Sequence, residues 1–210
     1  MKPQIKKLKF VIIEHSLLRP FTIKEAIILK VIVMKANNRK LNEFPYSKNA
    51  IHTMADVSPN TVSKALLKFK RYGLINELDN YKIHLSSNNL SEFFEDADRD
   101  YISYEEKHRS GIITVPYIHF NFELCKKLKL NEIQYSMLHT FYILAKKRKY
   151  AFISPLYFVR NFRMEIRSFQ YNKEKLTKLG YIFKRGNSNV VYISDDAIEL
   201  FNNCTIKKVI

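Results

Sequence analysis

A chain of 210 residues with 46% hydrophobic and 13% aromatic side chains is long and apolar enough to fill packed cores, which argues against a largely disordered protein. Its 36 Lys and Arg residues outnumber 20 Asp and Glu residues, and the formal charge of +16 favours a polyanionic partner over an idle basic surface. The chain has no run of roughly 20 apolar residues and no signal-peptide core, so we expect no membrane span and a cytoplasmic location.

The first predicted unit begins with a β-rich run from Leu8 to Ile13, which a long helix follows. Thr22 and Glu25 have the spacing of a capping box at the start of that helix, and the apolar residues after them indicate heavy burial. The helix runs into a basic loop. A second, shorter helix is predicted to begin at Ser47, whose hydroxyl can accept a hydrogen bond from an otherwise unpaired backbone amide.

A third helix is predicted after a tight turn at Asp56-Val57, because Ser58-Pro59 combines a helix cap with a proline at the first helical position. One apolar stripe at helical spacing runs along it, formed by Val62, Ala65, Leu66 and Phe69. Gly73 ends the helix, since glycine readily takes the left-handed conformation that closes one. Two short strands over residues 74–75 and 81–85 then form a hairpin.

An acidic connector separates two basic blocks. Residues 1–85 hold 16 basic and 6 acidic residues, residues 86–110 hold 3 and 7, and residues 111–210 hold 17 and 7. Both blocks therefore suit polyanion binding. The connector also carries aromatic residues, which a purely disordered tether does not need, so it either links the blocks or packs against one of them or against a second chain.

The second block repeats the pattern of the first at an offset of 107 residues, without a gap from Leu8 to Leu85. The offset places Glu25 over Glu132 and Gly73 over Gly180. A strand is predicted within residues 112–122, helices follow Asn131 and Ser154, and a hairpin spans residues 181–193 with a basic tip. Each unit thus has the order strand, three helices and hairpin.

The segment Ile51–Leu66, with its continuation to Ile75, resembles the helix-turn-helix core of winged-helix regulators. The resemblance lies in the small Ala55 at the helix crossing, the Ser-x-x-Thr-Val start of the third helix and the Gly-Leu-Ile entry to the hairpin. The second unit departs from it, because Phe162 replaces the small residue and Arg167-Ser168-Phe169 replaces Asn-Thr-Val. The tandem layout also resembles replication initiators of plasmids and phages.

The resemblance implies an α+β, mainly α, fold of two tandem winged-helix modules joined by an acidic connector. We expect module one at residues 1–88, the connector at 89–110 and module two at 111–210. In such a module the third helix enters the major groove and the hairpin, or wing, contacts the neighbouring backbone or minor groove.

Candidate DNA contacts are assigned from these positions. In module one Asn60, Thr61 and Lys64 are expected near base edges, and Lys68 and Arg71 on phosphates. Ser58, at the start of the same helix, is also assigned to the DNA contacts. In module two they are Arg163, Arg167, Ser168, Gln170 and Tyr171 at the third helix, with Lys184 and Arg185 on the wing. A solvated polar face is the alternative interpretation of the same residues.

We therefore expect a sequence-specific double-stranded DNA-binding protein, either a transcriptional regulator or a replication initiator. A protein-interaction scaffold built on winged helices is the alternative from another class. The sequence has no paired-carboxylate, His-x-x-x-His or phosphate-cradling glycine motif, and Cys125 and Cys204 lack metal-site spacing. We expect no enzyme activity, cofactor or metal, and either a monomer that spans adjacent grooves or a homodimer.

Overall fold

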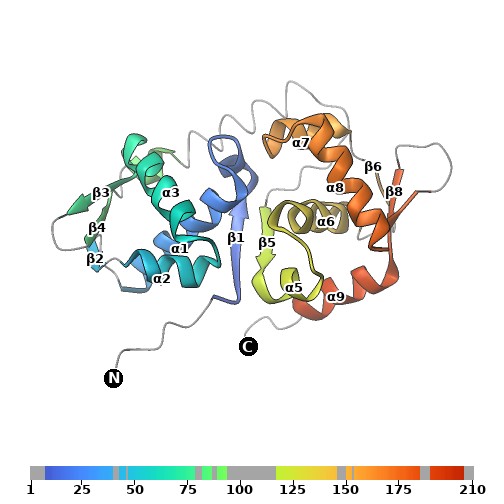
Figure 1. Ribbon diagram of the computed structural model, residues 1–210, viewed down its shortest axis with the longest axis horizontal. Coiled ribbons are helices and arrows are strands. Elements are labelled where there is room, and N and C mark those ends of the chain that lie inside the picture. Colours follow the sequence, from blue (N-terminus) through green and yellow to red (C-terminus); the bar gives the residue numbers. More distant parts are fainter. Residues whose placement is uncertain are drawn as a thin grey trace.

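The computed structural model describes residues 8–39, 43–45, 47–78, 82–86, 89–93, 117–145, 150–152, 154–184 and 190–205. Over these ranges the chain has an α+β fold that is mainly helical and contains small antiparallel sheets. Two halves lie on either side of a central pair of strands, β1 and β5 (Figure 1). The predicted fold class is confirmed at this level.

The two halves share one order of elements. The first half contains β1 (Phe10–Glu14), the 3-10 helix η1 (His15–Leu18), α1 (Ile23–Arg39), β2 (Glu43–Pro45), α2 (Lys48–Ala55), α3 (Pro59–Arg71), β3 (Ile75–Leu78) and β4 (Lys82–Leu85). The second contains β5 (Tyr117–Asn121), α5 (Phe122–Lys127), α6 (Glu132–Ala145), β6 (Tyr150–Phe152), α7 (Pro155–Asn161), α8 (Ile166–Lys178), β7 (Ile182–Phe183), β8 (Val190–Ile193) and α9 (Asp195–Thr205).

The offset of 107 residues recurs in the structure. It relates β1 to β5, β2 to β6 and α3 to α8 at both ends of each element. The sheets match as well, since strand order is β2-β4-β3 in one half and β6-β8-β7 in the other. A further helix follows the hairpin in both halves, at residues 89–93 and as α9. The repeat inferred from sequence is therefore a repeat of structure.

Local hydrogen bonds explain where the long helices begin. At α1 the backbone N–H of Thr22 donates to the Glu25 carboxylate over 2.8 Å, and the Glu25 N–H donates to the Thr22 hydroxyl over 3.3 Å. At α6, Asn131 and Gln134 make the same reciprocal pair over 3.2 and 2.8 Å. The predicted capping box is confirmed, and a second one follows Leu130.

The shorter helices also begin at the predicted caps. The hydroxyl of Ser47 accepts from the amide of Ala50, and that of Ser154 accepts from Leu156. Gly73 and its counterpart Gly180 close α3 and α8 with φ values of +67° and +76°. A side chain there would strain the backbone, so glycine sets the direction in which each chain enters its hairpin.

The core runs through the centre of the molecule. Val11 and Ile13 of β1 and Ile118 and Phe120 of β5 point to the same side of their sheet and are buried. Helix α6 is buried along nearly its whole length, which fits a central position between the β1–β5 pair and the elements outside it. Residues 89–93, predicted as the start of the connector, contact the first half.

That contact has a clear physical basis. The side-chain amide of Asn89 donates to the carbonyl of Gly73 over 2.9 Å, Leu90 is buried, and the Phe93 ring lies 5.5 Å from the ring of Phe21. The rest of the predicted connector, residues 94–110, lies outside the described residues. The predicted strand start at residues 112–116 does so too, and Phe122 begins α5 instead of ending the strand.

Candidate nucleic-acid interface

Helix α3 buries one face and presents a basic face to solvent. Val62, Ala65, Leu66 and Phe69 are buried, as the apolar stripe predicts. Asn60, Lys64, Leu67, Lys70 and Arg71 are exposed. The helix carries four basic side chains and no acidic one. A polyanion approaching this face therefore meets positive charge without a carboxylate to repel it.

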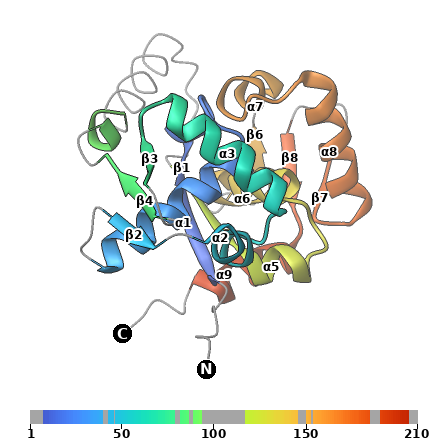
Figure 2. The same cartoon turned by 60° about the vertical axis from the view of Figure 1, so that its left-hand side comes forward.

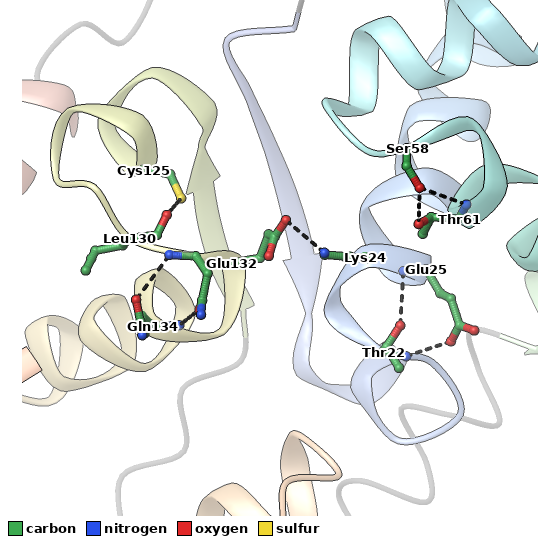
Figure 3. Close-up of polar contacts among 10 residues, drawn as sticks. Thr22, Lys24, Glu25, Ser58, Thr61, Cys125, Leu130, Glu132 and Gln134 are labelled. Atoms are coloured by element: carbon green, nitrogen blue, oxygen red, sulfur yellow. Dashed lines mark hydrogen bonds and ion pairs between the residues drawn. The ribbon is translucent and has the colours of Figure 1, made fainter. Parts of the chain in front are cut away.

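The start of α3 is held by its own side chains. The Ser58 hydroxyl accepts the backbone N–H of Thr61 over 3.2 Å, and the two hydroxyl oxygens lie 2.8 Å apart (Figure 3). Both residues were predicted as DNA contacts. In the structure their hydroxyls cap the helix, so they can offer an incoming ligand only their remaining hydrogen-bonding capacity.

Lys68 differs from the other predicted contacts of α3. Its ammonium lies 2.8 Å from the Glu25 carboxylate of α1 and 5.2 Å from the centre of the Phe21 ring. Only 27% of its side chain is exposed. Since Glu25 also accepts the amide of Thr22, one carboxylate joins the capping box of α1 to the middle of α3. Lys68 thus holds α3 on the core.

Helix α8 presents a different set of groups from the equivalent positions. Arg167, Gln170, Tyr171, Glu174, Lys175 and Lys178 are exposed. The Tyr171 side chain is 57% exposed, and the Lys175 ammonium lies 5.7 Å from the centre of its ring. Ser168 is half-buried, and its hydroxyl accepts a 3.3 Å hydrogen bond from Asn172. Arg167, Gln170 and Tyr171, which were predicted as DNA contacts, are therefore accessible to a ligand.

Arg163 lies before α8, in the turn that follows α7. Its backbone is left-handed, with φ +48°, and its guanidinium donates to the carbonyl of Pro20 in the first half over 3.1 Å. The sequence placed Arg163 at the start of the third helix, but α8 begins at Ile166. The arginine connects the two halves, and this contact was invisible to sequence reasoning.

The hairpin of the second half carries Lys184 directly after β7, where it is exposed. The pKa of Lys173 on α8 is lowered, mainly by partial burial and to a smaller extent by the positive charge of Lys184. The two positive charges thus repel each other where α8 meets the hairpin, and an anion bound there would relieve this repulsion. Arg185 and the hairpin tip lie outside the described residues.

Three buried titratable groups of the described residues are uncharged at neutral pH. Burial lowers the pKa values of His15 and His139 to about 3, so both are neutral at neutral pH. Burial raises the pKa of the Cys125 thiol to about 12, and that thiol donates to the carbonyl of Leu130. No three His, Cys, Asp or Glu side chains group as metal ligands among the described residues.

Sequence reasoning missed exposed residues at the outer ends of both third helices. These are Leu67 and Lys70 on α3, and Glu174, Lys175 and Lys178 on α8. Helical spacing from Lys64 and Tyr171 would have found Leu67, Glu174 and Lys175, since residues three or four apart share a face. In the described ranges, no helix is both long and apolar enough to cross a bilayer.

Comparison of the chain with protein-family models, curated proteins and solved structures gave no significant match. The function of the chain is therefore inferred from the geometry of its two halves and from the groups that they expose.

Proposed function

We propose that this chain is a sequence-specific double-stranded DNA-binding protein, in which each half is a winged-helix module. The order of strand, three helices and hairpin, with a three-stranded sheet at the outer end, supports the assignment of the module. Helices α3 and α8 are then the recognition helices, and the β3–β4 and β7–β8 hairpins are the wings.

The exposed face of α3 is the observation that best supports this proposal. It combines Asn60 and Lys64, which suit the base edges of adenine and guanine, with Lys70 and Arg71, which suit phosphates. The absence of an acidic residue from α3 matters as much, because a carboxylate facing the backbone of DNA would oppose binding. Arg167 and Gln170 give α8 a matching capacity for guanine and adenine.

Control of transcription is the process we favour for such a protein. The tandem layout favours a second candidate, initiation of replication on a plasmid, phage or other mobile element. Both require the same binding activity and differ in where the sites lie. Isolated sites beside promoters would support the first, and clustered copies of one site at a replication origin would support the second.

The test is selection of random-sequence duplexes by the purified full-length chain, followed by binding assays at two salt concentrations. We expect one enriched motif, and a loss of base preference at one position in Lys64→Ala. A base contact contributes about 1 to 3 kcal/mol of discrimination. Lys127→Ala is the matched control, because it removes an equal charge from an exposed position on α5. Failure to enrich any motif, with binding lost at moderate salt, would leave only nonspecific electrostatic attraction.

A further inference from the structure

The pairing of β1 with β5 gives the molecule an internal two-fold symmetry. Ile12 lies directly opposite His119, and these residues are counterparts at the offset of 107. On one side Val11 pairs with Phe120, and on the other Ile13 pairs with Ile118. If each residue of β1 is exchanged with its counterpart in β5, the pairing of the two strands is therefore unchanged. Antiparallel strands paired this way are related by a two-fold axis that passes between Ile12 and His119, perpendicular to the sheet.

The symmetry extends to the turns that precede the proposed recognition helices. Asp56 and Arg163 are counterparts, and both are left-handed, with φ values of 52° and 48°. Asp56 forms an ion pair with Lys126 of α5 in the other half, over 2.5 Å. Arg163 donates to the carbonyl of Pro20, directly after the counterpart of Lys126, over 3.1 Å. Each turn thus contacts the same place on the opposite half.

The central helices meet near the same axis. Lys24 of α1 forms an ion pair with Glu132 of α6 over 3.5 Å, and these residues lie at the first turns of two helices that are counterparts (Figure 3). In Figure 1, α2 lies at the lower left and its counterpart α7 at the upper right, as an axis close to the viewing direction requires. In the turned view the first half comes forward, and α3 is drawn in front of α6 of the second half (Figure 2).

We infer that one chain binds an inverted pair of half-sites, as a homodimer would, but with a different sequence preference in each half. This inference rests on the proposed function. Recognition helices related by a two-fold axis approach the duplex in opposite directions, so their half-sites are inverted, with centres about one helical turn apart. Modules related by translation along DNA would instead bind direct repeats.

The two half-sites are unequal because the exposed positions of α3 and α8 differ in chemistry. Asn60 corresponds to Arg167, Lys64 to Tyr171 and Leu67 to Glu174. Asparagine pairs with adenine and leucine contacts the methyl group of thymine, whereas arginine pairs with guanine and glutamate accepts from cytosine. The base that faces Asn60 should therefore be adenine, whereas the base that faces Arg167 in the other half-site should be guanine.

The spacing between the half-sites should be strict. Both recognition helices begin directly after turns that are tied to the opposite half, and the strands between the halves bury Val11, Ile13, Ile118 and Phe120. If the two half-sites lay on different faces of the duplex, one half of the protein would have to rotate relative to the other to reach both. Such a rotation would break these contacts. Insertion of half a turn of DNA thus removes one module from its groove.

The experiment uses the full chain and duplexes that carry the two selected half-sites in inverted or direct orientation, with zero or five added base pairs. We expect the inverted duplex to bind one chain, and the five-pair insertion to weaken binding about tenfold or more. Asn60→Ala should alter the base preference of one half-site and Arg167→Ala that of the other. Mass measurement of the complex gives the number of chains.

The outcomes separate this inference from the function on which it rests. Selection of a motif with directly repeated half-sites, with a single half-site or with tolerance of the insertion would overturn the inference and leave DNA recognition intact. Two chains on one palindromic site would overturn it too. Selection of no motif would remove the proposed function and this inference together.

Discussion

Tyr157 of α7 and His15 of η1 form a buried hydrogen bond between the two halves, with 3.0 Å from the phenol oxygen to Nδ1. The Phe162 ring packs edge-on against the same imidazole, with centroids 5.3 Å apart. Phe162 stands where the first half has Ala55, and the counterpart of His15 is Phe122. Ala55 and Phe122 line a cavity of about 340 Å³ between the halves. The contact around His15 is therefore filled by aromatic rings, whereas its symmetric counterpart around Phe122 contains a cavity.

Acid should destabilise the fold through its buried histidines. The pKa values of His15 and His139 fall from 6.5 to about 3 because burial disfavours the charged ring. The unfolded chain therefore binds more protons than the folded chain between pH 6.5 and 3. Stability is fully present above pH 6.5 and is lost as the pH falls, by about 1.4 kcal/mol per pH unit for each histidine. Urea unfolding at pH 7 and pH 5 measures this slope.

The control for the pH effect is His139→Leu, which keeps a similar volume among Tyr135, Tyr142 and Phe201. The variant should lose less stability between pH 7 and pH 5 than the natural chain, by about 2 kcal/mol. The comparison removes the contribution of carboxylates, which both proteins share. An equal loss in the two proteins would mean that His139 takes up no proton on unfolding.

The two capping boxes should contribute similar free energies. Thr22→Ala and Asn131→Ala each remove the side-chain oxygen that accepts an amide at the first turn of a central helix. We expect each to lower the free energy of unfolding by about 0.5 to 2 kcal/mol. Thr177→Ala is the control, since Thr177 is exposed on α8 and bonds only a carbonyl of its own helix. A control as costly as the caps would point to loss of helix packing instead.

The two faces of the β1–β5 pair should respond differently to truncation. Phe120 is 2% exposed and its ring lies 4.8 Å from that of Tyr135, whereas Phe10 is 43% exposed on the opposite face. Phe120→Ala should cost about 3 to 5 kcal/mol of stability and Phe10→Ala below about 1 kcal/mol. Equal losses in denaturant unfolding would indicate that another chain or segment covers the outer face.

Local sequence chemistry predicted the ends of the helices well. Ser47, Ser58, Ser154 and the Thr22–Glu25 pair are the caps in the structure, because capping depends on residues within one turn. The same signal was overlooked at α9, where Ser194 accepts the amide of Ala197. Contacts between segments that are distant in the sequence could not be predicted. Strand periodicity indicates which residues face a core but not which partner strand lies alongside.

The predictions for the candidate site divide in the same way, because local positions could be predicted and distant contacts could not. Helical spacing set Asn60 and Lys64 apart from the apolar stripe of α3, and both are exposed, as are Arg167 and Gln170 of α8. It gave no warning that Arg163 would contact Pro20, because that partner lies in the other half. Nor did it indicate the ion pair of Lys68, whose partner precedes it by 43 residues. Their charge alone made these residues candidates for DNA contacts. Only the fold shows which partner each side chain contacts.

Lys64 and Lys68 should separate binding from stability. Lys68→Ala removes an ion pair that is three-quarters buried and a ring contact, so it should lower the free energy of unfolding while barely changing affinity for DNA. Lys64→Ala should do the reverse, since its side chain is exposed. Thermal unfolding and duplex binding on the same two variants give the comparison. A loss of affinity in Lys68→Ala at a temperature where it is fully folded would return Lys68 to the interface.

The hairpin of the second half should contribute nonspecific affinity. Lys184 is exposed beside Lys173, and Arg185 follows it in the sequence. Each cation placed on a phosphate releases condensed counterions, so the double variant Lys184→Ala, Arg185→Ala should flatten the slope of log K against log salt by about 1.8. Affinity should fall alike for all sequences, because phosphates carry no base identity. Titrations between about 50 and 200 mM salt, a range wide enough to resolve such a change, make the measurement. An unchanged slope would show that the wing does not touch the backbone, and an altered base preference would place it in a groove.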